Sequence, residues 1–320
     1  MSAFEPFEAF GDLEEIAERL ASRDAAVRRL AVIDLLETSN IEAVPLLARA
    51  MRDDVAAVRL QAARALGEFD GLKVATALVG ALEDSDIEVA HAAADSLAEL
   101  RDPKAGAALL PLVAHCSAFV RAAIFRAFKA LQVNASLGPA IAALGDDEAA
   151  VRVQAVGVIG YLKLIETLPS LIGATRDQSA DVRLAAVNAL SFARNEAASK
   201  AAADALADPD WQVRSAASEV IGRIGEGSAA AALIKSLGDS YWQVRQKALQ
   251  SLGKLRSRDA VGPIIPFLDD ALPSLRKDAA AALGDIGDPR ARDALAARVR
   301  DEDPDVRKTV NWALRRLGAD

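Results

Sequence analysis

The sequence has very few of the residues that usually carry chemistry. Its single cysteine, Cys116, excludes an internal disulfide framework and fits a reducing compartment. It has only two histidines, His91 and His115, and it lacks a His-Glu dipeptide, an HExxH or CxxC motif and a glycine-rich phosphate loop. No nucleophile–histidine–acid arrangement occurs either. The sequence therefore predicts a protein that is not an enzyme, with no metal and no cofactor.

Aromatic residues, long apolar runs and excess positive charge are also scarce. Aromatic residues make up 4% of the chain, which argues against a single large globular core. No apolar run approaches membrane-spanning length, and residues 1–7 lack the charged stretch and apolar core of a secretory signal. The net charge of −8 and the pI of about 5.1 argue against a general nucleic-acid binder. We expect a cytoplasmic protein with no membrane partner. Nucleic-acid binding through a basic surface of the C-terminal repeats is a third, less favoured hypothesis.

The dominant feature of the chain is a repeat of 31 residues. An arginine marks nine of ten copies, and Ala90 takes its place in the third. An aspartate stands six residues earlier in eight copies, with Ser22 and His115 in the other two. The arginines are Arg28, Arg59, Arg121, Arg152, Arg183, Arg214, Arg245, Arg276 and Arg307. The aspartates are Asp53, Asp84, Asp146, Asp177, Asp208, Asp239, Asp270 and Asp301. A fixed period of this length indicates a stacked array.

Each copy predicts two short helices, A and then B. Apolar or small residues recur at offsets −1, +3 and +7 from the arginine position, which lie on one helical stripe. A glycine follows at offset +8 in five copies, where helix B should end: Gly67, Gly160, Gly222, Gly253 and Gly284. We expect each aspartate to cap the start of its helix B and to bond the arginine of its own or an adjacent repeat. Neighbouring pairs must then stack to share one core.

The repeat resembles a known family. Asp-Pro-Asp-x-x-Val-Arg at residues 208–214, Asp-Pro-Asp-Val-Arg at 303–307 and Leu-Gly-Asp-Ile-Gly-Asp-Pro-Arg at 283–290 are similar to the HEAT repeat, most closely to the short phycobilisome-lyase (PBS lyase HEAT-like) subtype. The resemblance implies an all-α, right-handed α-solenoid (superhelix) of about ten 31-residue HEAT-like helix-pair repeats. We expect one array over residues 12–320. Residues 1–11, which hold Phe4, Phe7 and Phe10, form either an N-terminal aromatic cap segment or a docking segment for a partner.

The first function hypothesis is a non-catalytic protein-binding scaffold, adaptor or assembly factor that uses the concave face of the solenoid. Trp211 and Trp242 share one offset in adjacent repeats, beside Tyr241, and either contact a protein partner or pack over the turns between repeats. Trp312 either covers the open end of the array or meets a partner. Basic residues of the late B helices complete the candidate partner-binding surface: Arg223, Lys247, Lys254, Lys277 and Lys308. Acidic B-helix residues dominate the early repeats, so the groove is expected to be bipolar.

The alternative function follows from the resemblance. It is a bilin or tetrapyrrole lyase-like protein, or a chromophore-handling protein of the phycobilisome-lyase group. In this case the cofactor-binding candidates are His91, His115, Cys116 and Phe119, which gather in the third and fourth repeats. The imidazole and thiolate groups could also hold a metal. A local defect in the array, with no ligand, is the other explanation of this cluster.

Overall fold

The computed structural model describes residues 13–38 and 40–318, so the expected cap segment, residues 1–11, lies outside the described residues. Over this part of the chain the protein is built from twenty α-helices, with short 3-10 turns and no strand. The chain divides into two compact units, Met1–Leu162 and Lys163–Asp320. Each unit is described by itself, and in each the prediction of an α-solenoid is confirmed.

Odd-numbered helices are the A helices and even-numbered helices are the B helices. The A helices are α1 (Leu13–Arg19), α3 (Val44–Ala50), α5 (Leu72–Val79), α7 (Gly106–Leu109), α9 (Leu137–Ala142), α11 (Leu168–Ala174), α13 (Glu196–Asp204), α15 (Ala230–Ser236), α17 (Val261–Ile264) and α19 (Arg292–Ala296). The B helices are α2 (Ala25–Glu37), α4 (Ala56–Leu66), α6 (Ile87–Glu99), α8 (Ala118–Leu131), α10 (Ala149–Leu162), α12 (Ala180–Ala189), α14 (Trp211–Ile224), α16 (Trp242–Lys254), α18 (Pro273–Ile286) and α20 (Pro304–Arg316).

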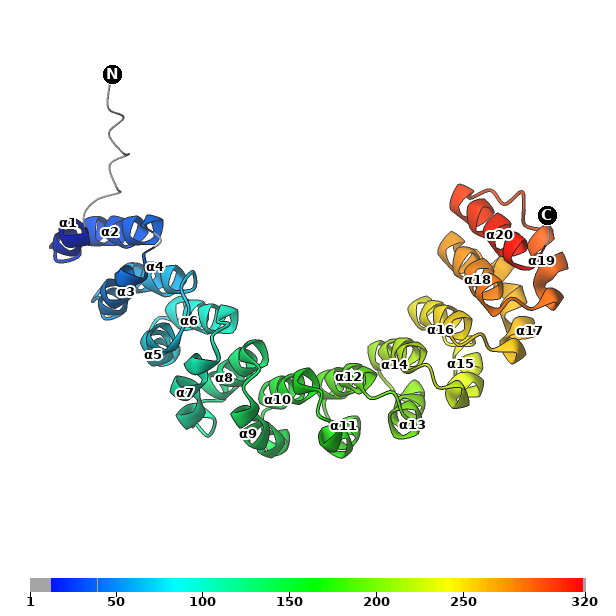
Figure 1. Ribbon diagram of the computed structural model, residues 1–320, viewed down its shortest axis with the longest axis horizontal. Helices are drawn as coiled ribbons and strands as arrows, with labels where there is room; N and C mark the ends of the chain where they lie inside the picture. The colour runs from blue at the N-terminus through cyan, green and yellow to red at the C-terminus, as the bar shows by residue number, and fades with distance from the viewer. Residues whose placement is uncertain (1–12, 39, 319–320) are drawn as a thin grey trace, which may run out of the picture. The chain divides into compact units, whose positions relative to one another are not determined.

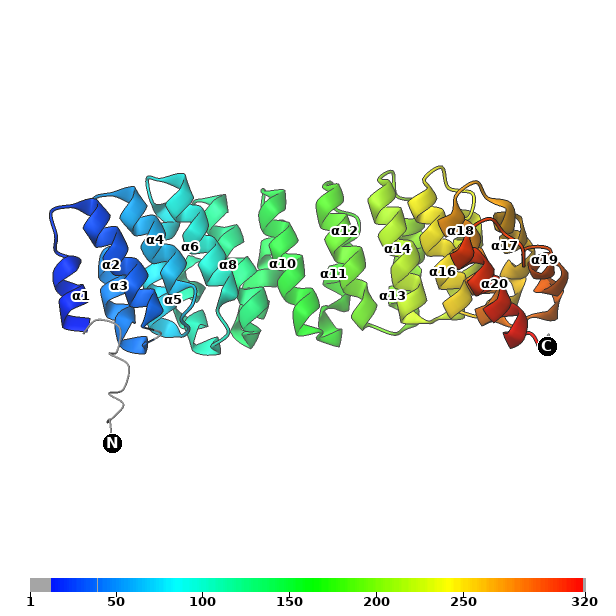
Figure 2. The same ribbon diagram turned by 90° about the horizontal axis from the view of Figure 1, so that it is seen from above.

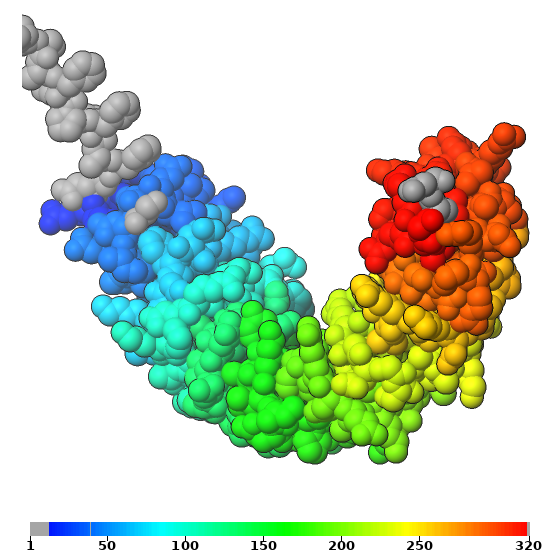
Figure 3. Space-filling view, turned by 45° about the vertical axis from the view of Figure 1, so that its right-hand side comes forward, coloured from blue at the N-terminus to red at the C-terminus, as the bar shows by residue number. Residues whose placement is uncertain are grey.

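Within each unit the A helices form one layer and the B helices form the other (Figure 1). Within each unit successive B helices lie side by side (Figure 2), and their side chains fill the space between repeats (Figure 3). The apolar stripe explains this packing, because its members are buried in repeats two to nine: Val213, Ala217 and Ile221 of α14 are completely inaccessible to solvent. The alanine at offset +3 leaves room for the neighbouring helix, while the larger residue at +7 fills the space between repeats.

The glycines at offset +8 do not end the B helices as expected. Four of the five lie inside a helix, and only Gly67 directly follows one. Gly67, Gly222, Gly253 and Gly284 are needed because the next B helix comes very close: a Cβ on Gly253 would lie 2.9 Å from the Cα of Ala282. In six of the described repeats the helix stops at or just before offset +11 instead. Residues there adopt the left-handed conformation with positive φ: Gln132, Lys163, Gly225, Arg256, Gly287 and Gly318.

The arginine and aspartate columns form a ladder between repeats. Each paired arginine donates through Nε and Nη2 to the two carboxylate oxygens of the aspartate 25 residues later, at 2.6–3.1 Å. The pairs, all inside one unit, are Arg28–Asp53, Arg59–Asp84, Arg121–Asp146, Arg183–Asp208, Arg214–Asp239 and Arg276–Asp301. The third nitrogen, Nη1, donates to carbonyl groups of the turn before its own helix, as Arg59 does to Asp53 at 2.8 Å. The ladder therefore satisfies turn carbonyls and joins consecutive repeats.

The aspartate of the ladder is not the helix cap that we expected. Its Oδ1 accepts the N–H two residues on, as Asp208 does from Asp210 at 2.9 Å, and this bond shapes the turn. In some repeats the capping side chain belongs to the residue two positions later: Asp210 accepts the N–H of Gln212 at 2.7 Å. Asp24, Asp86 and Asp303 cap their helices in the same way.

Candidate partner-binding surface

The B helices of the second unit share one exposed stripe, which we call the outer stripe. It consists of the residues at offsets −3, +1, +5 and +9, four residues apart, and none of them is fully buried in repeats seven to ten. These residues are Trp211, Ser215, Glu219 and Arg223 in α14, Trp242, Gln246, Gln250 and Lys254 in α16, Pro273, Lys277, Ala281 and Asp285 in α18, and Pro304, Lys308, Trp312 and Arg316 in α20. Most residues of the predicted partner-binding surface therefore lie on one face of consecutive helices. Tyr241 and Lys247 are the predicted residues beside the stripe.

The aromatic side chains meet across the junction between repeats seven and eight. The rings of Trp211 and Tyr241 stack with centroids 5.3 Å apart and an angle of 8°. The guanidinium of Arg214 lies 5.7 Å from the centroid of the Tyr241 ring. Tyr241 and Trp242 nonetheless keep 45% and 41% of their surface exposed, whereas Trp211 is half-buried. Trp211 thus packs over the junction, whereas Trp242 of α16 and its N-cap residue Tyr241 present their rings to solvent.

The sequence did not single out Leu272, which continues this aromatic row. It holds in repeat nine the position that Tyr241 holds in repeat eight, and 38% of its surface is exposed. The sequence contains this signal, because Tyr241 and Leu272 are separated by one repeat of 31 residues. We call Trp211, Tyr241, Trp242 and Leu272 the aromatic row.

Two of the predicted basic residues are engaged within the protein. Glu219 accepts from Lys247 of the next repeat at 2.7 Å and also pairs with Arg223 on its own helix. The hydrogen bond from Lys247 is the main reason that the pKa of Glu219 lies below its ordinary value. In contrast, Lys254, Lys277 and Lys308 are exposed and have no ion pair with any described residue. No carboxylate of the described residues neutralises these three lysines.

Trp312 packs within the protein. A Cβ on Gly284 of the preceding repeat would lie 2.6 Å from the Trp312 ring, so the indole lies against the backbone of α18. The Arg316 guanidinium covers the ring, 5.2 Å from its centroid, and its Nε donates to the Gly284 carbonyl at 3.1 Å. Trp312 therefore packs on the repeat before it, and remains half-exposed.

In the first unit, two irregular positions of the repeat, Ala90 and His115, correspond to one missing pair of the ladder. Ala90 and His115 are 25 residues apart, which is the spacing of every arginine–aspartate pair in the ladder. The sequence therefore lacks both partners of the same pair, and neither charge is left without its counterpart. The spacing of 25 residues between the two positions already carries this signal in the sequence.

His115 takes over part of the aspartate's role. Its Nδ1 accepts the N–H of Ser117 at 3.1 Å, the bond that Oδ1 of aspartate makes elsewhere. Its Nε2 lies 3.3 Å from a carboxylate oxygen of Glu83. Because Nδ1 accepts, the neutral ring carries its proton on Nε2, the nitrogen that lies near Glu83. The exposed Sγ of Cys116 is 4.0 Å from Nδ1.

The four cofactor candidates fall into two separate pairs. His91 of α6 lies against Phe119 of α8, with ring centroids 5.2 Å apart, while His115 and Cys116 are neighbours before α8. A hollow of about 470 Å³ beside His91 is lined by α4, α6 and α8, including Glu68, Asp95 and Arg126, and it does not contain His115 or Cys116. Among the described residues no group of three or more histidine, cysteine, aspartate and glutamate side chains could hold a metal ion.

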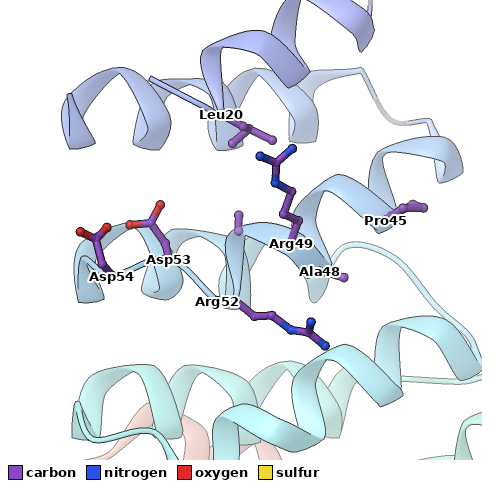
Figure 4. Close-up of a pocket in the computed structure, with 8 residues that line it drawn as sticks. Leu20, Pro45, Ala48, Arg49, Arg52, Asp53 and Asp54 are labelled. Atoms are coloured by element: carbon purple, nitrogen blue, oxygen red, sulfur yellow. The ribbon is translucent and has the colours of Figure 1, made fainter. Parts of the chain in front are cut away.

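Another hollow lies between the first two repeats on the side of the A helices. It measures about 590 Å³ and its lining mixes acidic, basic and apolar side chains (Figure 4). Arg49 points toward Leu20, and Arg52 points the other way, toward the next repeat (Figure 4). Arg52 accordingly lines the neighbouring hollow as well, together with Lys73. These hollows are spaces between successive A helices and do not gather side chains around one point.

The described helices and surfaces define a class of protein, an α-solenoid of helix pairs whose B helices present charged and aromatic side chains. A model of HEAT repeats matches residues 13–85, 58–129, 137–222, 199–270 and 230–315, so the chain belongs to the HEAT-repeat family. The phycobilisome-lyase subtype is a finer prediction that these matches leave open. A search of curated proteins finds no match.

Two solved structures share the fold. An engineered protein is 18% identical with a TM-score of 0.53, over 96% of this chain and 99% of its own. The YibA protein of Escherichia coli is 18% identical with a TM-score of 0.55, over 93% of this chain and 99% of its own. At this identity the likeness concerns the fold alone. In the described part of the chain, no helix combines the length and the apolar character needed to cross a membrane.

Proposed function

We propose that the protein is a non-catalytic adaptor or assembly factor of the cytoplasm that holds a protein partner on the B-helix face of its second unit. One observation carries the proposal: Tyr241 and Trp242 expose their rings on the same B-helix face as lysines that have no ion pair among the described residues. Large exposed aromatic side chains anchor protein interfaces, and neighbouring charges steer the partner and select it. Arrays of this kind use extended surfaces of successive repeats for binding.

The charge at offset +9 of the B helices differs between the two units. In the first three repeats the residues there are Glu37, Glu68 and Glu99, all exposed. In repeats seven to ten the same offset holds Arg223, Lys254, Asp285 and Arg316, so this part of the second unit is mainly basic. This charge favours a partner that is acidic where it contacts the second unit.

Affinity capture from native lysate tests the proposal. Wild-type protein is compared with a Trp211→Ala, Trp242→Ala variant and with a Tyr161→Ala control, which removes an exposed aromatic ring from the first unit. We expect a defined protein to be retained by the wild type and the control and lost from the double variant. Equal capture by all three would reject the surface. If no protein is captured and the wild type shows a visible absorbance band or takes up a bilin, the tetrapyrrole alternative replaces the adaptor.

A further inference from the structure

We infer that the ligand of this surface is an acidic, proline-rich segment that lies in polyproline II conformation across the B helices of repeats seven to ten. The inference rests on the proposed function, because it names the chemistry of the partner at the same surface. It depends on three features of the second unit: the geometry of the aromatic row, the position of the free lysines and the spacing between repeats.

The aromatic row runs across the repeats at the N-terminal ends of the B helices. Trp211 begins α14, Trp242 begins α16, and Tyr241 and Leu272 are the residues directly before α16 and α18. The stacking of Trp211 on Tyr241, with Arg214 close to the Tyr241 ring, holds these groups in place before any ligand arrives. A pre-ordered surface loses little conformational entropy on binding.

The spacing of the row fits an extended ligand. Packed helices are about 8–10 Å apart. A polyproline II segment rises about 3.1 Å per residue with three residues per turn, so it advances about 9 Å per turn. One turn of ligand therefore covers one repeat and places equivalent residues over Trp211, Trp242 and Pro273. Exposed flat aromatic rings are also the surfaces on which other proteins recognise proline-rich segments.

The free lysines determine the charge of the ligand. Lys277 and Lys308 occupy the same offset in repeats nine and ten, one helical turn, or about 6 Å, beyond Pro273 and Pro304. Both are exposed and without an ion pair among the described residues. A ligand that continues past the aromatic row reaches these ammonium groups, and carboxylates complement them.

A protein segment fits this surface better than single-stranded nucleic acid, although aromatic and basic groups serve both. Asp210 caps α14, and Asp278 and Asp285 lie among the lysines. These carboxylates would repel a continuous line of phosphates, whereas a peptide can place its acidic residues selectively over the lysines. Asp278 already accepts the side-chain amides of Gln246 and Gln250, at 2.7 and 3.1 Å, so its position is fixed.

The test is fluorescence anisotropy with labelled synthetic peptides and the full-length protein. The probe is four repeats of Glu-Pro-Pro. A Lys-Pro-Pro peptide has the same conformation with opposite charge, and a Glu-Ala-Ala peptide keeps the charge without the prolines. We expect the Glu-Pro-Pro peptide to bind at least tenfold more tightly than either control. We also expect its affinity to fall as salt increases.

Two variants locate the site. Trp211→Ala with Trp242→Ala and Lys277→Glu with Lys308→Glu should each weaken Glu-Pro-Pro binding at least tenfold, and the lysine variant should gain affinity for Lys-Pro-Pro. The Tyr161→Ala control should bind as the wild type does. Because all four residues are at least partly exposed, circular dichroism should show that the variants stay folded.

Several outcomes would overturn the inference. They are equal affinity for all three peptides, unchanged affinity in both variants, tighter binding of oligo(dT) through the same residues, or a wild-type dimer that the tryptophan variant converts to a monomer. If the wild type binds no peptide but the tryptophan variant still loses its protein from lysate, the inference fails and the proposed function stands. If capture is also unchanged, both fail.

Discussion

At the residue scale, the glycines of the B helices have a different role from the one that their position suggested. Gly222, Gly253 and Gly284 lie inside helices, where a glycine normally weakens the helix by about 1 kcal/mol relative to alanine. The structure shows what compensates for this loss. A Cβ at these positions would collide with Ser251, Ala282 or Ala313 of the next repeat.

Gly253→Ala should therefore destabilise the protein. The new Cβ would meet the backbone of Ala282, which cannot move without shifting α18, so we expect a loss of about 1–3 kcal/mol of unfolding free energy. Urea denaturation provides the measurement. The control is Gly173→Ala in α11, where nothing lies within 4 Å of the added carbon; this change should be neutral or stabilise by up to about 1 kcal/mol. Equal effects of the two changes would contradict the close approach.

At Arg256 the opposite substitution, to glycine, is expected to stabilise the protein. Arg256 has a φ of 51° at the offset where Gly225 and Gly287 end their helices, and its side chain is exposed. The left-handed conformation costs a non-glycine residue about 1 kcal/mol. Arg256→Gly should stabilise the protein by about 0.5–1 kcal/mol, and Gly225→Ala should destabilise it by about 1 kcal/mol. A thermal melt in which both variants move in the same direction would reject this explanation of the helix stop.

At the scale of elements, the unit of structure is the junction between two B helices. Buried apolar side chains of the stripe pack the two helices together, and the arginine–aspartate pairs of the ladder connect the turns that precede them. The junction of repeats three and four lacks its arginine–aspartate pair and has a histidine bonded to the turn instead. This junction shows that the array tolerates loss of one pair when both partners are absent together.

Restoring that pair should require both residues. Ala90→Arg alone adds a cation with no carboxylate at position 115, and His115→Asp alone adds a carboxylate with no arginine and removes the contact with Glu83. The double variant should be more stable than the sum of the single effects, with a coupling free energy of about 1–3 kcal/mol. The measurement is a double-mutant cycle by urea denaturation. Strict additivity would show that the spacing of 25 residues does not define this pair.

At the scale of the whole molecule, the repeated ladder makes stability depend on pH. The hydrogen bond from its arginine lowers the pKa of Asp84, Asp146 and Asp301 below the ordinary value. A carboxyl group with a lower pKa in the folded state contributes stability above its unfolded pKa, about 3.9, and loses that contribution as the pH falls through its folded pKa.

The urea midpoint should therefore change little between about pH 7 and pH 5 on account of the ladder, and fall as the pH drops below about 4. Asp84→Asn removes one titrating partner, so the variant should be less stable at pH 7 and its stability should fall less steeply with acid. Asp95→Asn is the control, because the Asp95–Arg126 pair is exposed and weak. An acid profile of Asp84→Asn that parallels the wild type would show that the ladder does not produce the pH dependence.

The sequence by itself determined the repeat, the helix pairs and the stacked architecture. These follow from a period that never varies between arginine positions and from an apolar stripe that no single helix can bury. It also placed most candidate partner-binding residues on one face, since offsets four residues apart lie on one side of a helix. Local periodicity carries this information, so no contact between distant residues was needed.

Only the tertiary structure decided which residues meet across the junctions. It assigned the aspartate of each paired rung to the arginine of the preceding repeat, placed the helix stop of six repeats near offset +11, and paired Trp211 with Tyr241 rather than with Trp242. It also showed that Lys247 pairs with Glu219, whereas Lys277 has no ion pair among the described residues. The physical reason is that these choices depend on the distance and rotation between neighbouring helices. Side-chain packing between repeats sets both quantities, and a periodic sequence pattern leaves them open.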